Sequence, residues 1–237
     1  MLRIEHLTKT YGSKKAVDDL SIEIRPGEIY GFIGHNGAGK TTTLKSCAGI
    51  LRFDLGDIFI DNVSVKQDPV LCKSKTAYIP DNPDIYDFMT GIGYLNFIGD
   101  IFRVDTQKRK ERIDKYAEAF EIRDVLAQPV SSYSHGMKQK LAVTAGLLHA
   151  PKLMLLDEPF VGLDPKAAFL LKGFMRELCD DGGAIFFSTH VLDVAEKLCD
   201  KVAIIKNGKL IVSGGMEEVK GDTSLEEVFL ELEDTKA

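Results

Sequence analysis

The stretch Gly34-His35-Asn36-Gly37-Ala38-Gly39-Lys40-Thr41 decides the fold class of this chain. It matches the pattern G-x-x-x-x-G-K-[ST], in which a glycine-rich turn aims its backbone N–H groups at a polyphosphate. In this pattern Lys40 places a positive charge at the β- and γ-phosphates, and the hydroxyl of Thr41 is a ligand for Mg²⁺. The stretch therefore predicts a nucleotide site between a strand and a helix.

The residues on both sides of this loop fit that expectation. Ile29–Ile33 is a short apolar run rich in strand formers, as a buried parallel strand would be. After the loop, Leu44, Cys47, Ala48 and Leu51 recur at helical spacing and predict one apolar helix face. The N-terminus of that helix points at the loop, and its free N–H groups favour an anion there.

The composition narrows the class of protein. The 237 residues include 30 basic and 36 acidic side chains, a formal net charge of −6, which argues against nucleic acid as the main partner. No apolar run approaches the ~18 residues that span a bilayer, and the first residues lack the apolar stretch of a signal peptide, so we expect a cytoplasmic protein. Four cysteines without C-x-x-C spacing are expected to be reduced, buried thiols: Cys47, Cys72, Cys179 and Cys199.

Hydrophobic periodicity alternates between strand and helix patterns along the chain. Apolar residues alternate with polar ones at 20–24, and turn residues bound a short strand at 56–62. Between about 85 and 150 the apolar residues fall at helical spacing. Asn207-Gly208, between two apolar runs, predicts a two-residue hairpin. Further apolar strands are expected at 153–156, 184–187 and 202–205.

This pattern predicts a sheet core interrupted by helices. We expect residues 1–83 and 151–220 to form the α/β nucleotide-binding core, and residues 84–150 to form an inserted helical subdomain. Residues 221–237 are expected to be an amphipathic acidic helix and tail.

Two polar clusters follow apolar strands of this core. Asp157 and Glu158 come directly after the strand that ends at Leu156. Because α/β proteins place their chemistry at the carboxyl ends of parallel strands, the aspartate is a candidate Mg²⁺ ligand and the glutamate a candidate base for an attacking water. The alternative is a polar turn enforced by Pro159. His190 follows another strand, where it is either structural or a donor to the γ-phosphate.

At this point the chain resembles the nucleotide-binding subunit of an ATP-binding-cassette (ABC) transporter over nearly its whole length. The resemblance rests on GHNGAGKT, YSHGM, LMLLDEP, GLD and STH in the order of that family. YSHGM, Tyr133 to Met137, is similar to the family signature LSGGQ, with Ser134 and Gly136 retained and the other three positions changed. The resemblance implies a single ABC ATPase domain over 1–237, with a RecA-like mixed sheet flanked by helices and an N-terminal antiparallel β subdomain.

The resemblance also implies roles for individual residues. Tyr11 matches the aromatic that stacks on adenine, Lys40, Thr41 and Thr42 the phosphate and magnesium contacts, and Asp157 the magnesium-associated aspartate. Glu158 matches the catalytic base, His190 the switch histidine, and Asp164 the loop aspartate that links two subunits. The signature residues are expected to contact the ATP of the opposing subunit: Ser134, His135, Gly136 and Met137.

Asp81 is a departure from the family pattern. The family has glutamine in the loop that joins the core to the helical subdomain, whereas AYIPDNP places Asp81 there. The carboxylate could bind magnesium more tightly than glutamine, or it could be remote from the metal. An ordinary Asp-Asn-Pro turn is the alternative.

The resemblance implies ATP and Mg²⁺ as cofactors, and a second copy or a paralogous cassette as dimer partner. It also implies a separate integral-membrane permease, which would hold the protein at the inner face of the membrane. The signature and the tail are similar to the branch that exports drugs, lipids or peptides. The alternatives are a soluble cassette ATPase acting on DNA or ribosomes, a P-loop kinase or GTPase, and a regulatory module without turnover. The excess of acidic residues and the single cassette argue against a cassette ATPase that acts on DNA or ribosomes. The absence of an N-K-x-D run argues against a GTPase.

Overall fold

The computed structural model describes residues 1–83 and 85–234. Its central sheet has the strand order β10-β9-β3-β8-β7-β6, in which β3, β6, β7, β8 and β9 run parallel and β10 pairs antiparallel with β9. The strands are β3 (Ile29–Ile33), β6 (Thr76–Ile79), β7 (Leu153–Asp157), β8 (Ala184–Thr189), β9 (Lys201–Lys206) and β10 (Lys209–Gly215).

The central strands are covered on both faces. Every residue of β3, β7 and β8 is buried, which explains why these segments read as continuous apolar runs rather than as alternating ones. Their carboxyl ends lie at one edge of the sheet, where β3 leads into Gly34, β7 ends at Asp157 and β8 ends at Thr189. The predicted phosphate loop and the predicted carboxylates are therefore brought together by strand pairing.

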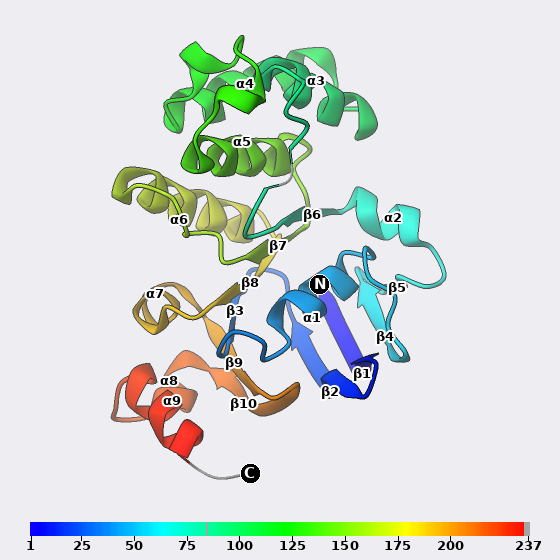
Figure 1. Ribbon diagram of the computed structural model, residues 1–237, viewed down its shortest axis with the longest axis vertical. Coiled ribbons are helices and arrows are strands. Elements are labelled where there is room, and N and C mark those ends of the chain that lie inside the picture. The colour runs from blue at the N-terminus through cyan, green and yellow to red at the C-terminus, as the bar shows by residue number, and fades with distance from the viewer. Residues whose placement is uncertain (84, 235–237) are drawn as a thin grey trace.

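A second, antiparallel sheet is formed mostly by the N-terminal strands. Its order is β2-β1-β4-β5, from β1 (Leu2–Tyr11), β2 (Lys14–Ile24), β4 (Leu55–Ile60) and β5 (Val63–Ser64). Helix α1 (Lys40–Cys47) lies between this sheet and the central one, and its Leu44 and Cys47 are fully buried (Figure 1). The helix is shorter than predicted, because Gly49 takes a φ of +64° and turns the chain away before Leu51.

The predicted insertion consists of helices. Its main members are α3 (Gly91–Ile101), α4 (Thr106–Ala119) and α5 (His135–Leu148), with short 3₁₀ turns at Arg123–Val125 and Val130–Ser132. Each of the three helices begins with a side-chain cap, from Thr90, Asp105 and Ser134 respectively. The helix α2 (Pro69–Ser74) precedes β6. Residue 84, where the predicted insertion begins, lies outside the described residues, and the division into subdomains stays a prediction.

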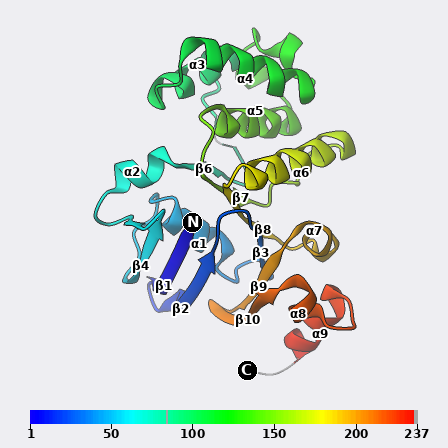
Figure 2. The ribbon, with the colours of Figure 1, turned by 180° about the vertical axis from the view of Figure 1, so that it is seen from behind.

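The C-terminal part returns to the sheet. Helix α6 (Pro165–Asp180) lies beside α5, whereas α7 (Leu192–Leu198), α8 (Met216–Lys220) and α9 (Leu225–Asp234) gather near β9 and β10, at the end of the molecule opposite α3 and α4 (Figures 1 and 2). The predicted hairpin is confirmed, since Asn207 and Gly208 both have positive φ between β9 and β10. The predicted tail helix is α9, and residues 235–237 of that tail lie outside the described residues.

All four cysteines are free thiols and buried, as predicted. Among the described residues, no helix is long and apolar enough to span a bilayer.

Candidate functional site

A hollow of about 300 Å³ opens at the carboxyl ends of the central strands. It is lined by most of the residues that the sequence predicted for nucleotide binding, together with both carboxylates. The lining residues are Tyr11, Lys14, Ala16, His35, Asn36, Gly37, Gly39, Lys40, Thr41, Thr42, Asp81, Asp157 and Glu158. Two predicted loop residues, Gly34 and Ala38, are buried beneath this lining.

The glycines of the loop are required by its geometry. Gly37 and Gly39 have φ values of +81° and +115°, which side-chain-bearing residues rarely adopt. A Cβ atom on Gly39 would overlap the carbonyl of Ala16, and one on Gly34 would overlap the carbonyl of Ile205. The loop therefore has this shape only with glycine at these positions.

Lys40 places a buried positive charge in the hollow. Only 6% of its side chain is exposed, and Nζ donates hydrogen bonds to the carbonyls of Gly34 (2.5 Å) and His35 (3.3 Å). The same Nζ lies 3.7 Å from Oε1 of Glu158. Burial lowers the pKa of Lys40, and the negative charges of Glu158 and Asp157 act in the opposite direction. A charge with so little water around it attracts phosphate oxygens strongly.

Asp157 presents an unpaired oxygen in a buried position. Its Oδ1 accepts a hydrogen bond of 2.5 Å from the Ser188 hydroxyl, whereas Oδ2 is buried without a hydrogen-bond partner. Such an orphaned carboxylate oxygen, with the Thr41 hydroxyl lining the same hollow, fits a Mg²⁺ ion. Within the described part of the chain, no group of three or more His, Cys, Asp or Glu residues is arranged to hold a metal. Mg²⁺ suits this donor set, because it is commonly bound by one or two carboxylates together with substrate phosphates.

Glu158 is held in a strained backbone conformation. Its φ is +48°, in the left-handed region that non-glycine residues seldom occupy. Its N–H donates to both the carbonyl (3.2 Å) and the hydroxyl (3.1 Å) of Ser188, which compensates for the strain. The carboxylate lies 2.9 Å from Nδ1 of His190, whose side chain is about half exposed. Lys40, Glu158 and His190 thus form a row in space, a cation, a carboxylate and an imidazole, at one edge of the sheet.

Tyr11 and Asp81 lie at the margin of the hollow. Tyr11 ends β1 with half of its surface exposed, and the ammonium of Lys9 lies 5.3 Å from its ring centre. Asp81 lines the hollow, but its Oδ1 accepts a hydrogen bond of 2.8 Å from the N–H of Asn82, as in the turn that the sequence offered as an alternative. Asp81 therefore borders the hollow and also forms the local turn.

The signature residues lie elsewhere. Ser134 caps α5 by accepting a 3.3 Å hydrogen bond from the N–H of Met137, as its sequence position predicts. None of the residues 134–137 lines the hollow. Instead, the start of α5 faces the loop before α6: a Cβ on Gly136 would come within 2.6 Å of the Gly162 carbonyl oxygen. Asp164 in this loop caps α6 at the Ala167 N–H (2.8 Å).

A family model described as "ABC transporter" matches residues 17–161 of the chain, more than half of its length. The chain belongs to the ABC transporter family. It is an ATP-binding subunit of that family and an ATPase.

Relatives and solved structures agree with this assignment. The ABC transporter ATP-binding protein YxlF of Bacillus subtilis (strain 168) is 38% identical over 220 residues, which cover 93% of this chain and 72% of the relative. EcsA of the same organism is 31% identical, with 98% and 96% covered. A solved ATP-binding subunit of an ABC transporter superposes with a TM-score of 0.95 at 30% identity, covering 99% of this chain and 100% of the other. The cassette MJ0796, solved as a dimer with ADP and Pi, has the same fold (TM-score 0.82, 21% identity, 91% and 99% covered).

Several residues of the nucleotide hollow and its surroundings were not predicted from the sequence: Lys14 and Ala16 in the lining, and the polar residues Ser188 and Gln139 close to it. Ser188 links Asp157 and Glu158, and Gln139 of α5 donates a 3.4 Å hydrogen bond from Nε2 to the Pro159 carbonyl. Both are fully buried. The available signal was a polar side chain within an otherwise apolar strand or helix, which a search for motifs does not use.

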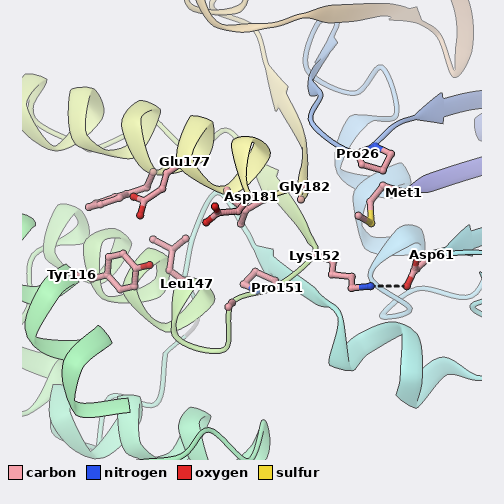
Figure 3. Close-up of a pocket in the computed structure, with 14 residues that line it drawn as sticks. Met1, Pro26, Asp61, Tyr116, Leu147, Pro151, Lys152, Glu177, Asp181 and Gly182 are labelled. Atoms are coloured by element: carbon pink, nitrogen blue, oxygen red, sulfur yellow. Dashed lines mark hydrogen bonds and ion pairs between the residues drawn. The ribbon is translucent and has the colours of Figure 1, made fainter. Parts of the chain in front are cut away.

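A second hollow is separate from this site. It has about 520 Å³ and lies between α4, α5 and α6 and the N-terminal strands (Figure 3). Two of its charged residues, Lys152 and Asp61, form a 3.1 Å ion pair across its edge. None of the phosphate-loop residues lines it.

Proposed function

We propose that the protein binds two ATP molecules between two cassettes, hydrolyses them, and thereby drives a separate membrane permease that exports a drug, lipid or peptide. The proposal that the protein hydrolyses ATP rests on one observation: Lys40, Glu158 and His190 form a row beside the carboxylate oxygen of Asp157 that has no hydrogen-bond partner. These groups can bind a polyphosphate, orient a water and stabilise developing charge, which are the needs of phosphoryl transfer to water.

The proposed chemistry is in-line attack of water on the γ-phosphate, which breaks the bond between the γ-phosphorus and the bridging oxygen and yields ADP and inorganic phosphate. Glu158 orients the water and accepts its proton, because its carboxylate is fixed by a constrained backbone and by His190. Lys40 and the loop N–H groups bind the phosphate oxygens and stabilise the charge that builds up on them. Thr41 and Asp157 would hold Mg²⁺, which when bound neutralises charge on the β- and γ-phosphates.

The proposed dimer places the signature of one cassette against the ATP of the other. Two observations support it: the signature residues do not line the nucleotide hollow of their own chain, and Ser134 and His135 at the start of the signature helix are exposed, where a helix N-terminus favours an anion. The structural neighbour MJ0796 was solved as a dimer after hydrolysis. The partner is a second copy or a paralogous cassette, with Asp164 in the loop that links the two.

The proposed permease contact lies at a groove of about 700 Å³ between the core and the helices. Asp81 lines both this groove and the nucleotide hollow, so movement at one can reach the other. CbiO1 from Clostridium perfringens, which is part of the ABC transporter complex CbiONQ, has a similar structure (TM-score 0.78, 25% identity, 98% of this chain and 93% of that chain covered). On this proposal the protein is peripheral at the cytoplasmic face of the membrane, and nucleic acid is not a partner.

Two variants test the roles proposed for Glu158 and Lys40. Glu158→Gln should bind ATP but release phosphate at least a hundredfold more slowly, and should form an ATP-dependent dimer detectable by light scattering. Lys40→Ala should lose most of its ATP affinity in calorimetry. Wild-type turnover by Glu158→Gln would remove that residue as the base.

The proposed contact between the signature of one cassette and the ATP of the other needs a separate test with its own control. Ser134→Arg places a bulky charge at the signature, whereas Ser132→Arg introduces the same residue at another exposed position two residues earlier. We expect Ser134→Arg to abolish the dimer and the ATPase activity, and Ser132→Arg to keep both. Equal behaviour of the two variants would contradict the proposed dimer. Co-reconstitution with the membrane protein of a neighbouring gene, followed by ATP-dependent efflux of dyes, lipids and peptides, tests the export.

A further inference from the structure

The C-terminal helix α9 packs against the phosphate loop. The ring of Phe229 meets the ring of His35 edge-to-face, with 4.9 Å between ring centres and 64° between ring planes. Lys206, at the end of β9, donates a 3.1 Å hydrogen bond to the carbonyl of Leu232 in the same helix. The C-terminal helix therefore touches His35, the second residue of the phosphate loop.

The helix α9 is anchored at its other end. Leu225 is fully buried, and its N–H donates a 3.0 Å hydrogen bond to Glu196 of α7. Phe229 has only 8% of its surface exposed, whereas Leu230, the next residue, has 57% exposed. Because one face of α9 is buried and its first residue is bonded to α7, the contact with the loop is one of several that hold Phe229 in place.

His35 is well placed to transmit this contact. His35 lines the nucleotide hollow and also a smaller hollow of about 240 Å³ on the side of β9. Its carbonyl accepts hydrogen bonds from Nζ of Lys40 (3.3 Å) and from the N–H of Ala38 (3.1 Å). A shift of His35 therefore moves an acceptor of the phosphate lysine. The neighbouring glycines make the loop deformable, so that an external contact can set its shape.

We propose that Phe229 is a positioning residue for the phosphate loop, acting through the ring of His35, and that nucleotide binding and the docking of α9 are coupled. The proposal rests on nucleotide binding at this loop, and adds to it a control exerted by the C-terminal helix. By linkage, a helix that stabilises the binding-competent loop must itself be stabilised by nucleotide.

The experiment compares Phe229→Ala with the matched control Leu230→Ala in the full chain, with MgADP titrated by calorimetry. An aromatic pair contributes an effect of about three- to tenfold in an equilibrium constant. We expect Phe229→Ala to raise the Kd of MgADP by that factor and Leu230→Ala to leave it unchanged. Phe229→Tyr, which keeps the ring, should restore the affinity. If Phe229→Ala does not fold, Phe229→Leu removes the ring and keeps an apolar side chain in its place.

A double-mutant cycle separates positioning from general destabilisation. In a His35→Ala background, Phe229→Ala should have no further effect on the Kd, because the ring that it acts on is gone. Hydrogen exchange gives a second readout: MgADP should slow exchange in residues 225–234 of the wild type but not of His35→Ala.

The outcomes separate a failure of the positioning role of Phe229 from a failure of nucleotide binding at the phosphate loop. If the wild type does not bind MgADP, the nucleotide site itself is wrong. If the wild type binds and Phe229→Ala binds equally well, or if its effect persists unchanged without His35, the positioning role is refuted.

Discussion

The contact between the signature and the loop before α6 can be tested with one added methyl group. Gly136 is in the first turn of α5, and Gly173 is in the middle of α6. A Cβ on Gly136 would come within 2.6 Å of the backbone oxygen of Gly162, whereas one on Gly173 would have nothing within 4 Å. Alanine at either position favours the helix, but only at Gly136 does it collide with backbone.

The two variants should therefore change the free energy of unfolding in opposite directions. Gly173→Ala should raise the free energy of unfolding by about 0.5–1 kcal/mol, the helix-propensity difference between glycine and alanine. At Gly136 the propensity gain is reduced by the position in the first turn, and displacing a packed backbone group costs about 1–3 kcal/mol. We expect Gly136→Ala to lower the free energy of unfolding by about 1 kcal/mol or more.

The displacement should also lower the rate of ATP hydrolysis. The carbonyl of Gly162 has to retreat by several tenths of an ångström, and Gly162 lies four residues after Glu158 in the same loop. Because small misplacements of catalytic groups can cost up to about a hundredfold in rate, we expect the ATPase rate of Gly136→Ala to fall at least about tenfold.

Urea unfolding and phosphate release measure the two effects, with Gly173→Ala as the control for alanine in a helix. A Gly136→Ala protein that is stabilised as much as Gly173→Ala, with wild-type ATPase activity, would refute the proposed contact between signature and loop.

Three further predictions concern pH, the buried carboxylate and the nucleotide base. Burial lowers the pKa of His149 from 6.5 to about 4, and the charge of Arg112 acts in the same direction. Between pH 6.5 and 4 the unfolded state therefore binds more protons than the folded state, and the free energy of unfolding falls as the pH drops through this range. Between about pH 7.5 and 5 the wild type should lose about 2 kcal/mol more than His149→Phe in urea unfolding, and equal losses would contradict a neutral buried imidazole. Ser188→Ala removes the hydrogen bonds to Asp157 and Glu158 and should lower the free energy of unfolding by about 1.5–3 kcal/mol; a change below the error of the denaturation curve would argue against their importance. Tyr11→Ala should weaken ATP binding by about 1–3 kcal/mol in calorimetry while Tyr11→Phe does not, and a normal affinity of the alanine variant would exclude base stacking.

Features that depend on a few neighbouring residues could be predicted from the sequence. The glycines of the phosphate loop, the Asn207-Gly208 hairpin and the helix cap at Ser134 each follow from backbone preferences within a short segment. The buried strands followed from their apolar runs, since a strand covered on both faces has no polar side. The family resemblance rested on the order of such local motifs, and the roles that it implies for individual residues remain predictions.

Contacts between distant segments were decided only by the tertiary structure. Ser188 lies beside Asp157 because β7 and β8 pair in parallel with these two residues in register. Phe229 meets His35 although nearly the whole chain separates them, and the signature faces Gly162 rather than its own phosphate loop. Periodicity and motifs show which face of an element is buried, but not which surface covers it, because that choice depends on the packing of all the elements at once.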